Sequence, residues 1–238
     1  MQVVSLSFFR FDGLWNRCWA FSQMQFARGP LRRLPGIGFS KLLGTGSREG
    51  FHPFPNFGVY AILATWPSLE HARRQLAEAP VYGRYRNHAS EHWTVFLQAS
   101  RCRGEWAGEA PFEVAADGPE LPVAVLTRAT IKLRAVVPFW RRVPNISAMI
   151  PGQEQLAFKA GLGEIPWVHQ VTFSIWHDLD AMREFAYRGF HNEAIEQVRK
   201  GQWFSEELFA RFHVVGADGR WEGQKPLDLQ EDAGLSHA

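Results

Sequence analysis

The sequence predicts an α+β fold in which two copies of one unit close into a barrel within a single chain, because one sequence pattern occurs twice along the chain. Residues 59–70 and 169–180 share one pattern, a strand that ends in tryptophan and leads into the start of a helix. In each copy a second tryptophan follows after the same interval of 27 residues, at Trp93 and at Trp203. A further shared fragment precedes each strand, at residues 39–46 and 158–163. Two diverged copies of one supersecondary unit explain these matches most simply.

The first half begins with a strand at residues 3–11, which is rich in β-branched and aromatic residues. Apolar residues then recur at helical spacing from Leu14 to Phe26. Residues 29–58 hold many glycines and prolines and predict a long irregular loop with one helical turn. The expected elements that follow are a strand at 58–66, helices at 68–78 and 81–91, and a strand at 93–97.

The second half repeats this plan after a linker or edge hairpin at residues 100–121. The expected elements are a strand at 123–133, a helix at 137–143, a short helix at 156–160, a strand at 168–176, a long helix at 178–200, a helix at 203–211 and a strand at 212–215. The polar, glycine-rich tail from residue 217 predicts fraying. We therefore divide the chain into an N-terminal half (1–100), a linker (101–120), a C-terminal half (121–216) and a flexible tail (217–238).

Each half reads roughly as β-α-β-α-β, with amphipathic helices that can cover one face of an antiparallel sheet. One such ferredoxin-like unit leaves a sheet face exposed. Two units in one chain can bury these faces against each other and close the sheets, which also removes the strand edges. The expected fold is therefore a tandem duplication of two ferredoxin-like units that forms a single-chain barrel of the dimeric α+β type.

The composition is that of an ordinary globular protein with an unusual share of aromatic residues. The chain has 238 residues, of which 46% are hydrophobic, enough for a continuous core. Its 10 Trp and 19 Phe favour large flat apolar contacts in the interior, at an interface or around a bulky ligand. A net charge of +2 gives no case for nucleic acid. A basic cluster around Arg28, Arg32, Arg33 and Lys41 reads as a solvated loop or as a contact with anionic lipid or an acidic redox partner.

The two cysteines and the N-terminus predict a cytoplasmic protein. Cys18 and Cys102 have no CxxC spacing, which indicates reduced thiols. The N-terminus has no basic leader, and no stretch approaches the roughly 20 apolar residues of a membrane-spanning helix.

His191 is the strongest single candidate for chemistry. On a helix at 178–200, Tyr187, Ile195 and Val198 share its face, which is apolar. A histidine in such surroundings needs a partner for its nitrogens, and either a hydrogen-bonded neighbour or a metal ion would satisfy it. The equivalent residue in the first half, 110 positions earlier, is Val81, so the histidine occurs in one copy alone.

A competing pattern, His88-Ala-Ser-Glu91-His92, matches the H-x-x-E-H motif of inverted zinc peptidases. Two histidines four residues apart on one helix can bind zinc, with a nearby carboxylate as the base. Here His92 directly precedes the strand at 93–97, so the pair spans a helix end, and a solvated helix terminus is the favoured interpretation.

Six separated segments, in order, resemble the spheroidene monooxygenase family. They are residues 4–14, 61–66, 126–131, 146–150, 169–176 and 203–212. The resemblance implies an oxygen-dependent enzyme that oxidises C-2 of acyclic carotenoids to a ketone, by two hydroxylations at one carbon and loss of water. It also implies haem b as the cofactor and a ferredoxin as the electron donor.

Together with the apolar helix face, the resemblance implies that His191 Nε2 binds the haem iron. Tyr187, Ile195, Trp203 and Phe204 would then contact the cofactor, with Trp176 as a further wall, although core packing explains these aromatic residues equally well. The implied catalytic groups, which would help O–O cleavage, are Arg128, Ser147 and Lys159. Arg128 and Lys159 could instead pair with the haem propionates.

Two alternatives keep the fold but change the function. One is a haem enzyme that acts on a different apolar or nitrogenous substrate. The other is a barrel without a cofactor that binds a hydrophobic small molecule, which colour distinguishes because a haem protein is red. Peripheral contact with the inner membrane and a homo-oligomer remain open.

Overall fold

A computed structural model describes residues 1–47, 54–115, 122–147, 156–177, 179–180, 182–183 and 201–227, and for residues 142–147 it describes the backbone alone. Its strands are β1 (Val3–Arg10), β2 (Ser40–Gly46), β3 (Pro55–Trp66), β4 (Glu91–Gly104), β5 (Val123–Ile131), β6 (Leu156–Gly163), β7 (His169–Trp176) and β8 (Phe204–Gly219). Its helices are α1 (Gly13–Phe26), α2 (Arg28–Arg32), α3 (Leu69–Glu78), α4 (Pro80–His88), the 3₁₀ turn η1 (Leu133–Ala135) and α5 (Val136–Ser147). Among the described residues, no helix has the length and apolar character needed to cross a bilayer.

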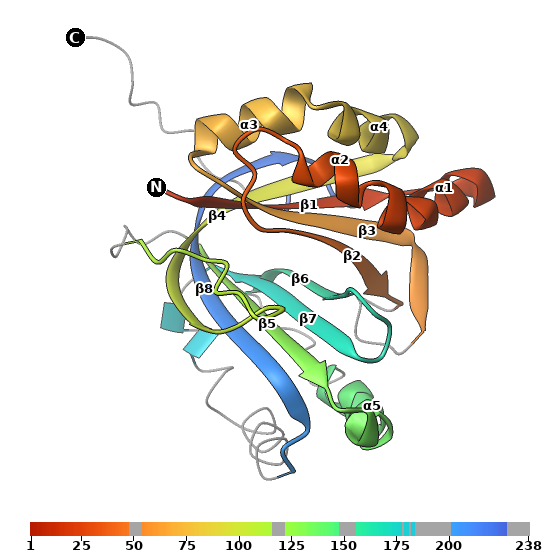
Figure 1. The fold of residues 1–238 in the computed structure, drawn as a ribbon, viewed down its shortest axis with the longest axis vertical. Helices are drawn as coiled ribbons and strands as arrows, with labels where there is room; N and C mark the ends of the chain where they lie inside the picture. The colour runs from red at the N-terminus through yellow and green to blue at the C-terminus, as the bar shows by residue number, and fades with distance from the viewer. Residues whose placement is uncertain are drawn as a thin grey trace.

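Within the described residues, eight antiparallel strands close into a barrel in the order β1-β3-β2-β6-β7-β5-β8-β4 (Figure 1). Each half contributes four neighbouring strands, and both halves arrange them in the same order. The register repeats as well, since Val3 pairs with Trp66 in the first half and Val123 pairs with Trp176 in the second. The predicted fold class, two ferredoxin-like units that form one single-chain barrel, is confirmed.

The two halves join along two seams of very different length. Strands β4 and β8 pair from Trp93 to Gly104, whereas β2 and β6 pair through Gly44 with Gly163 and Thr45 with Leu162 alone in the described part of the chain. The β2–β6 seam is therefore the weaker closure of the barrel.

The barrel is filled with side chains. Along β1, Val4, Leu6 and Phe8 face inward, while Val3 and Phe9 belong to a second core on the outer side. This alternation is the period of two that a strand imposes. Aromatic rings pack the interior, as where the ring centres of Trp93 and Phe158 are 4.7 Å apart. Helices α1, α3 and α4 cover the outer face of the first half (Figure 1).

Three predicted elements were wrong. Residues 40–46, expected within a loop, form β2, and the segments expected as helices at 156–160 and 203–211 lie in β6 and β8. In β8 the residues Leu208, Ala210, Phe212 and Val214 are buried in strict alternation. Burial of one face of the sheet therefore outweighed the helix propensity of the glutamates, leucine and alanine in this segment.

Two expected boundaries also differ. Strand β4 continues to Gly104, into the segment expected as a linker. Strand β8 continues to Gly219, and Trp221 then pairs with Gln224, so backbone pairing extends into the first residues of the segment expected as a flexible tail. The helix expected at 178–200 lies almost wholly outside the described residues.

Candidate functional site

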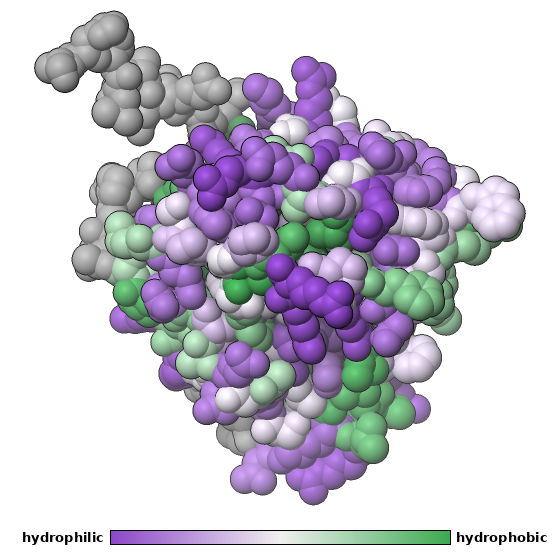
Figure 2. Space-filling view, turned by 45° about the horizontal axis from the view of Figure 1, so that its top comes forward, coloured by the Kyte–Doolittle hydropathy of each residue, from purple (hydrophilic) through white to green (hydrophobic). Residues whose placement is uncertain are grey.

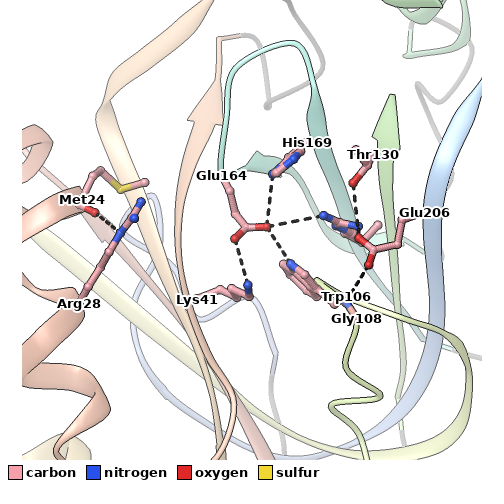
Figure 3. Close-up of polar contacts among 10 residues, drawn as sticks. Met24, Arg28, Lys41, Trp106, Gly108, Thr130, Glu164, His169 and Glu206 are labelled. Atoms are coloured by element: carbon pink, nitrogen blue, oxygen red, sulfur yellow. Dashed lines mark hydrogen bonds and ion pairs between the residues drawn. The ribbon is translucent and has the colours of Figure 1, made fainter. Parts of the chain in front are cut away.

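A partly buried ionic network lies at one end of the barrel, and Glu164, just after β6, is at its centre (Figure 3). One carboxylate oxygen accepts a hydrogen bond from Trp106 Nε1 at 2.7 Å, and the other is 3.3 Å from Lys41 Nζ on β2. Arg128 of β5 and His169 of β7 reach the carboxylate at 4.0 Å and 3.7 Å. Residues from both halves of the chain therefore meet on one carboxylate.

Arg128 is the most deeply buried charged member of this network, with 2% of its side chain exposed. Its guanidinium pairs with Glu206 of β8, which also accepts a hydrogen bond from Gly108 N at 2.9 Å. Burial lowers the pKa of Arg128, and Glu164 opposes that shift. Two carboxylates thus hold a positive charge inside the barrel, as buried guanidinium groups require.

The pKa of His169 is lowered from its ordinary value. Burial lowers its pKa, Glu164 raises it, and the charges of Arg128 and Lys41 lower it further. Its Nδ1 is buried and has no hydrogen-bond partner among the described residues. A neutral imidazole beside a carboxylate can accept or pass a proton, so the network contains groups suited to proton transfer.

The expected catalytic residues Arg128 and Lys159 lie on opposite faces of the barrel wall. Arg128 pairs across the sheet with Val171 and Leu208, which belong to the interior cluster, so it points into the barrel. Lys159 lies opposite Ser174 on the outer face, because the flanking residues of its strand pack inward. The side chain of Ser147 lies outside the described residues.

Among the expected cofactor contacts, Trp203 and Phe204 are described, whereas Tyr187, His191 and Ile195 lie outside the described residues. Phe204 pairs with Ile131 at one end of β5, and Trp176 pairs with Val123 at the other end. Eight residues of strand separate these positions by about 27 Å. Trp176 is 2% exposed and packs with Val123 and Met182.

The outer faces of the two half-barrels differ. In the first half, the paired residues Ser7 and Ile62 are both 0% exposed beneath the helices. The equivalent pair in the second half is Thr127 and Thr172, whose hydroxyl groups bond to each other where solvent reaches them. In the part of the chain that the structure describes, the second sheet therefore presents small side chains on an open face.

An apolar groove of about 310 Å³ lies over the β2–β6 seam, between α1 and α5. Its lining includes Phe21, Phe57, Tyr60, Trp140 and Trp167, and Glu164 also borders it. The ionic network thus reaches the floor of this groove. A second cavity of about 340 Å³ opens into the same seam and is bordered by Phe8, Phe158, Lys159 and Trp221.

The zinc alternative does not fit the geometry. His88 ends α4, where its ring stacks on Trp19 with centres 4.0 Å apart, and His92 lies on β4. Glu91 pairs with Arg10 at 3.3 Å. Within the described residues, no three histidine, cysteine or acidic side chains lie close enough to hold a metal ion.

Comparison with known proteins identifies the family. The chain is 46% identical to the spheroidene monooxygenase of Cereibacter sphaeroides over 230 residues, which cover 95% of this chain and 71% of that protein. It is 47% identical to that of Rhodobacter capsulatus over 232 residues, which cover 95% of this chain and 96% of that protein. The chain belongs to the spheroidene monooxygenase family. Membership makes it a monooxygenase.

Two further comparisons extend this result. Residues 144–215 match a family described as a domain of unknown function, DUF3291. The crystal structure of an aldoxime dehydratase superimposes with a TM-score of 0.58 at 11% identity, covering 90% of this chain and 81% of that chain. The second likeness shows that the spheroidene monooxygenase family shares its fold with an enzyme of unrelated sequence.

Sequence patterns missed Glu164, His169, Lys41, Trp106 and Glu206. One signal was present, however. When the fragments at 39–44 and 158–163 are aligned, Glu164 stands where the first half has Thr45. The single-copy reasoning that selects His191 also selects this carboxylate.

Proposed function

We propose that this monooxygenase uses haem b to oxidise C-2 of acyclic carotenoids to a ketone. The identity to two spheroidene monooxygenases over 95% of the chain carries the substrate part of the proposal. The aromatic groove over the β2–β6 seam suits an apolar polyene.

The reaction balances as two hydroxylations at one carbon. In each round, one oxygen atom of O₂ enters a C–H bond and the other leaves as water, with two electrons and two protons supplied from outside. A ferredoxin-type protein is the proposed electron donor. The resulting geminal diol loses water to give the ketone, a step that needs no oxidant. Bound haem would supply the activation of O₂.

The open outer face of the second half supports a haem site there. Small side chains on this face leave room for a flat macrocycle, whereas helices close the same face in the first half. Val81, the equivalent of His191 under the 110-residue repeat, lies on α4, is 2% exposed and packs in the outer core of the first half. This symmetry supports the proposal that His191, at the equivalent position of the second half, is the iron ligand.

The neighbours of His191 follow from the same repeat. Tyr85, the equivalent of Ile195, is 1% exposed, whereas Ala77, the equivalent of Tyr187, is exposed. Ile195 is therefore the stronger of the two proposed haem contacts on this helix.

Other groups complete the proposed site. Lys159, on the outer face, is better placed than Arg128 to pair with a haem propionate, because Arg128 is engaged by two carboxylates inside the barrel. Trp203 and Phe204 remain proposed haem contacts at the end of β5, and Ser147 remains a proposed aid to O–O cleavage.

Product analysis tests the function. Purified protein receives an acyclic carotene, reduced ferredoxin and ¹⁸O₂, and the product is analysed by mass spectrometry. The expected product gains one oxygen and loses two hydrogens at C-2, and labelling appears in the alcohol intermediate. A red protein that leaves every acyclic carotene unchanged would assign the fold to another substrate, and a colourless protein would favour a cofactor-free binding barrel.

A further inference from the structure

Helix α1 exposes large apolar side chains to water, and its buried residues are only Ala20 and Gln23. Its outer side exposes Leu14, Trp15, Phe21 and Phe26 at 79%, 88%, 59% and 70%. An exposed apolar patch of this kind marks an interaction surface.

The exposed apolar surface continues from α1 across the groove to α5. The rings of Phe21 and Phe57 are 5.8 Å apart, and Trp140 of α5 donates a hydrogen bond to the Trp167 carbonyl at 3.1 Å. Phe57 and Trp167 are each about half exposed. We call this surface, made by Leu14, Trp15, Phe21, Phe26, Phe54, Phe57, Val137, Trp140, Ile165 and Trp167, the apolar rim. In Figure 2, apolar side chains gather along the edge where Figure 1 places α1 and α5.

Basic residues dominate the two chain segments that carry α1 and α5, and Glu164, which borders the groove, already pairs with Lys41 and Arg128. Residues 13–47 contain five cations, Arg17, Arg28, Arg32, Arg33 and Lys41, and no carboxylate side chain. Residues 121–147 again contain five, Arg128, Lys132, Arg134, Arg141 and Arg142, and no carboxylate. Of these, Arg128 is buried in the barrel and paired with Glu206, so Lys132, Arg134 and Arg141 are the described cations available at the surface. Helices α1 and α5 hold equivalent places in the two halves, so the same combination of apolar and basic residues borders the groove from both sides.

We propose that the apolar rim docks this protein onto a bilayer that contains anionic lipid, with the groove opening toward the lipid. Tryptophan and phenylalanine suit the boundary between headgroups and acyl chains, and flanking arginines pair with lipid phosphates. A second copy of the chain would bring two basic surfaces together, which is unfavourable. An acidic protein would pair with the arginines but leave the exposed rings in water. The docking stands on the apolar rim and its charge, and it does not depend on the proposed reaction.

Vesicle flotation tests this surface with the full-length purified protein. We expect the wild type to float with vesicles of phosphatidylcholine and phosphatidylglycerol and to remain at the bottom with pure phosphatidylcholine. Binding should weaken at high salt, which screens exposed charges. A fluorescent label on Cys18, which is exposed on α1, should shift to the blue on binding, and Cys18→Ser controls for the site of labelling.

Two variant pairs assign the binding to the apolar rim. The combined changes Leu14→Ser, Trp15→Ser and Phe26→Ser should abolish flotation, whereas Val114→Ser, which removes an exposed apolar residue elsewhere, should not. Arg32→Gln with Arg33→Gln should lower the partition coefficient about 25-fold, at about fivefold for each charge, and Arg84→Gln on α4 should leave it unchanged.

Several results would overturn the proposal. They are a wild type that ignores anionic vesicles, one that binds neutral vesicles equally well, and a triple variant that floats like the wild type. A dimer in light scattering that the triple variant converts to a monomer, without vesicle binding, would assign the apolar rim to self-association instead.

Discussion

Glu164 shows how a single carboxylate can hold two cations and an imidazole at the end of an otherwise apolar barrel. Lys41 and Arg128 both approach it, and His169 beside it has a pKa lowered chiefly by burial. Removal of one partner from such a buried group leaves charge without compensation, and this costs more than the intact pair contributes.

Glu164→Gln should therefore destabilise the protein by about 3 kcal/mol, because Lys41 and Arg128 lose a shared counter-charge. Urea denaturation followed by circular dichroism measures the change. Glu113→Gln, at an exposed carboxylate, is the control and should change the free energy of unfolding by less than about 0.5 kcal/mol. An equally small effect at Glu164 would show that the network adds little to stability.

His169 gives the network a predictable dependence on pH. Its pKa in the folded protein is lowered from 6.5, chiefly by burial, so the unfolded chain binds more protons in the range just below 6.5. Stability should therefore be complete above pH 6.5 and fall as the pH is lowered toward the folded pKa. Burial also lowers the pKa of His92, so His92 should add to the loss of stability as the pH falls.

The difference between the wild type and His169→Gln isolates this residue. The variant should lose part of the slope of unfolding free energy against pH between about pH 5 and 6.5. Parallel curves for the two proteins over this range would contradict the lowered pKa.

At the scale of elements, the short seam between β2 and β6 decides how the groove and the network meet. The described seam consists of Gly44 with Gly163 and Thr45 with Leu162, and Glu164 follows it immediately. A Cβ on Gly163 would lie 2.4 Å from the carbonyl oxygen of His169, whereas a Cβ on Gly44 would meet its nearest atom at 3.9 Å.

Gly163→Ala should therefore destabilise the protein by about 2 kcal/mol, because backbone and not a flexible side chain blocks the new methyl group. Gly44→Ala, the matched control across the seam, should change stability by less than about 0.5 kcal/mol. Thermal unfolding of both variants measures the difference, and equal melting temperatures would show that the seam yields easily.

The local sequence predicted correctly those elements in which the spacing of apolar residues matches the face that is buried in the structure. The strand at 3–11 and the helix from Leu14 to Phe26 correspond to β1 and α1. The glycines at 44 and 46 concealed β2, since glycine in sequence indicates a turn and only the pairing partner shows a strand. The segments in β6 and β8 carry good helix formers, and long-range pairing, which no local window contains, overrides them.

At the scale of the whole molecule, duplication provides two equivalent faces, and the two halves use them differently. Helices seal the first face, whereas the second presents Thr127 and Thr172 to solvent in the described part of the chain. From the sequence, the site could be predicted only by comparing the two copies and finding the residues that differ. This comparison selects His191 against Val81, and it could have selected Glu164 against Thr45. Arg128, by contrast, was assigned from sequence without knowing which side of β5 it faces, and that depends on the closed barrel.

The central proposal is that the second half binds haem through His191, and the absorption spectrum in the Soret region tests it most directly. The wild type and His191→Ala are expressed with added haem precursor, purified side by side, and assayed for haem b as the pyridine complex. His177→Ala, at an exposed histidine of the same half, controls for the loss of an imidazole. We expect a red wild type with haem stoichiometric to chain, an unchanged His177→Ala, and a His191→Ala protein that loses the Soret band or shifts it. A folded His191→Ala protein with an unchanged spectrum, or a colourless wild type, would contradict the account.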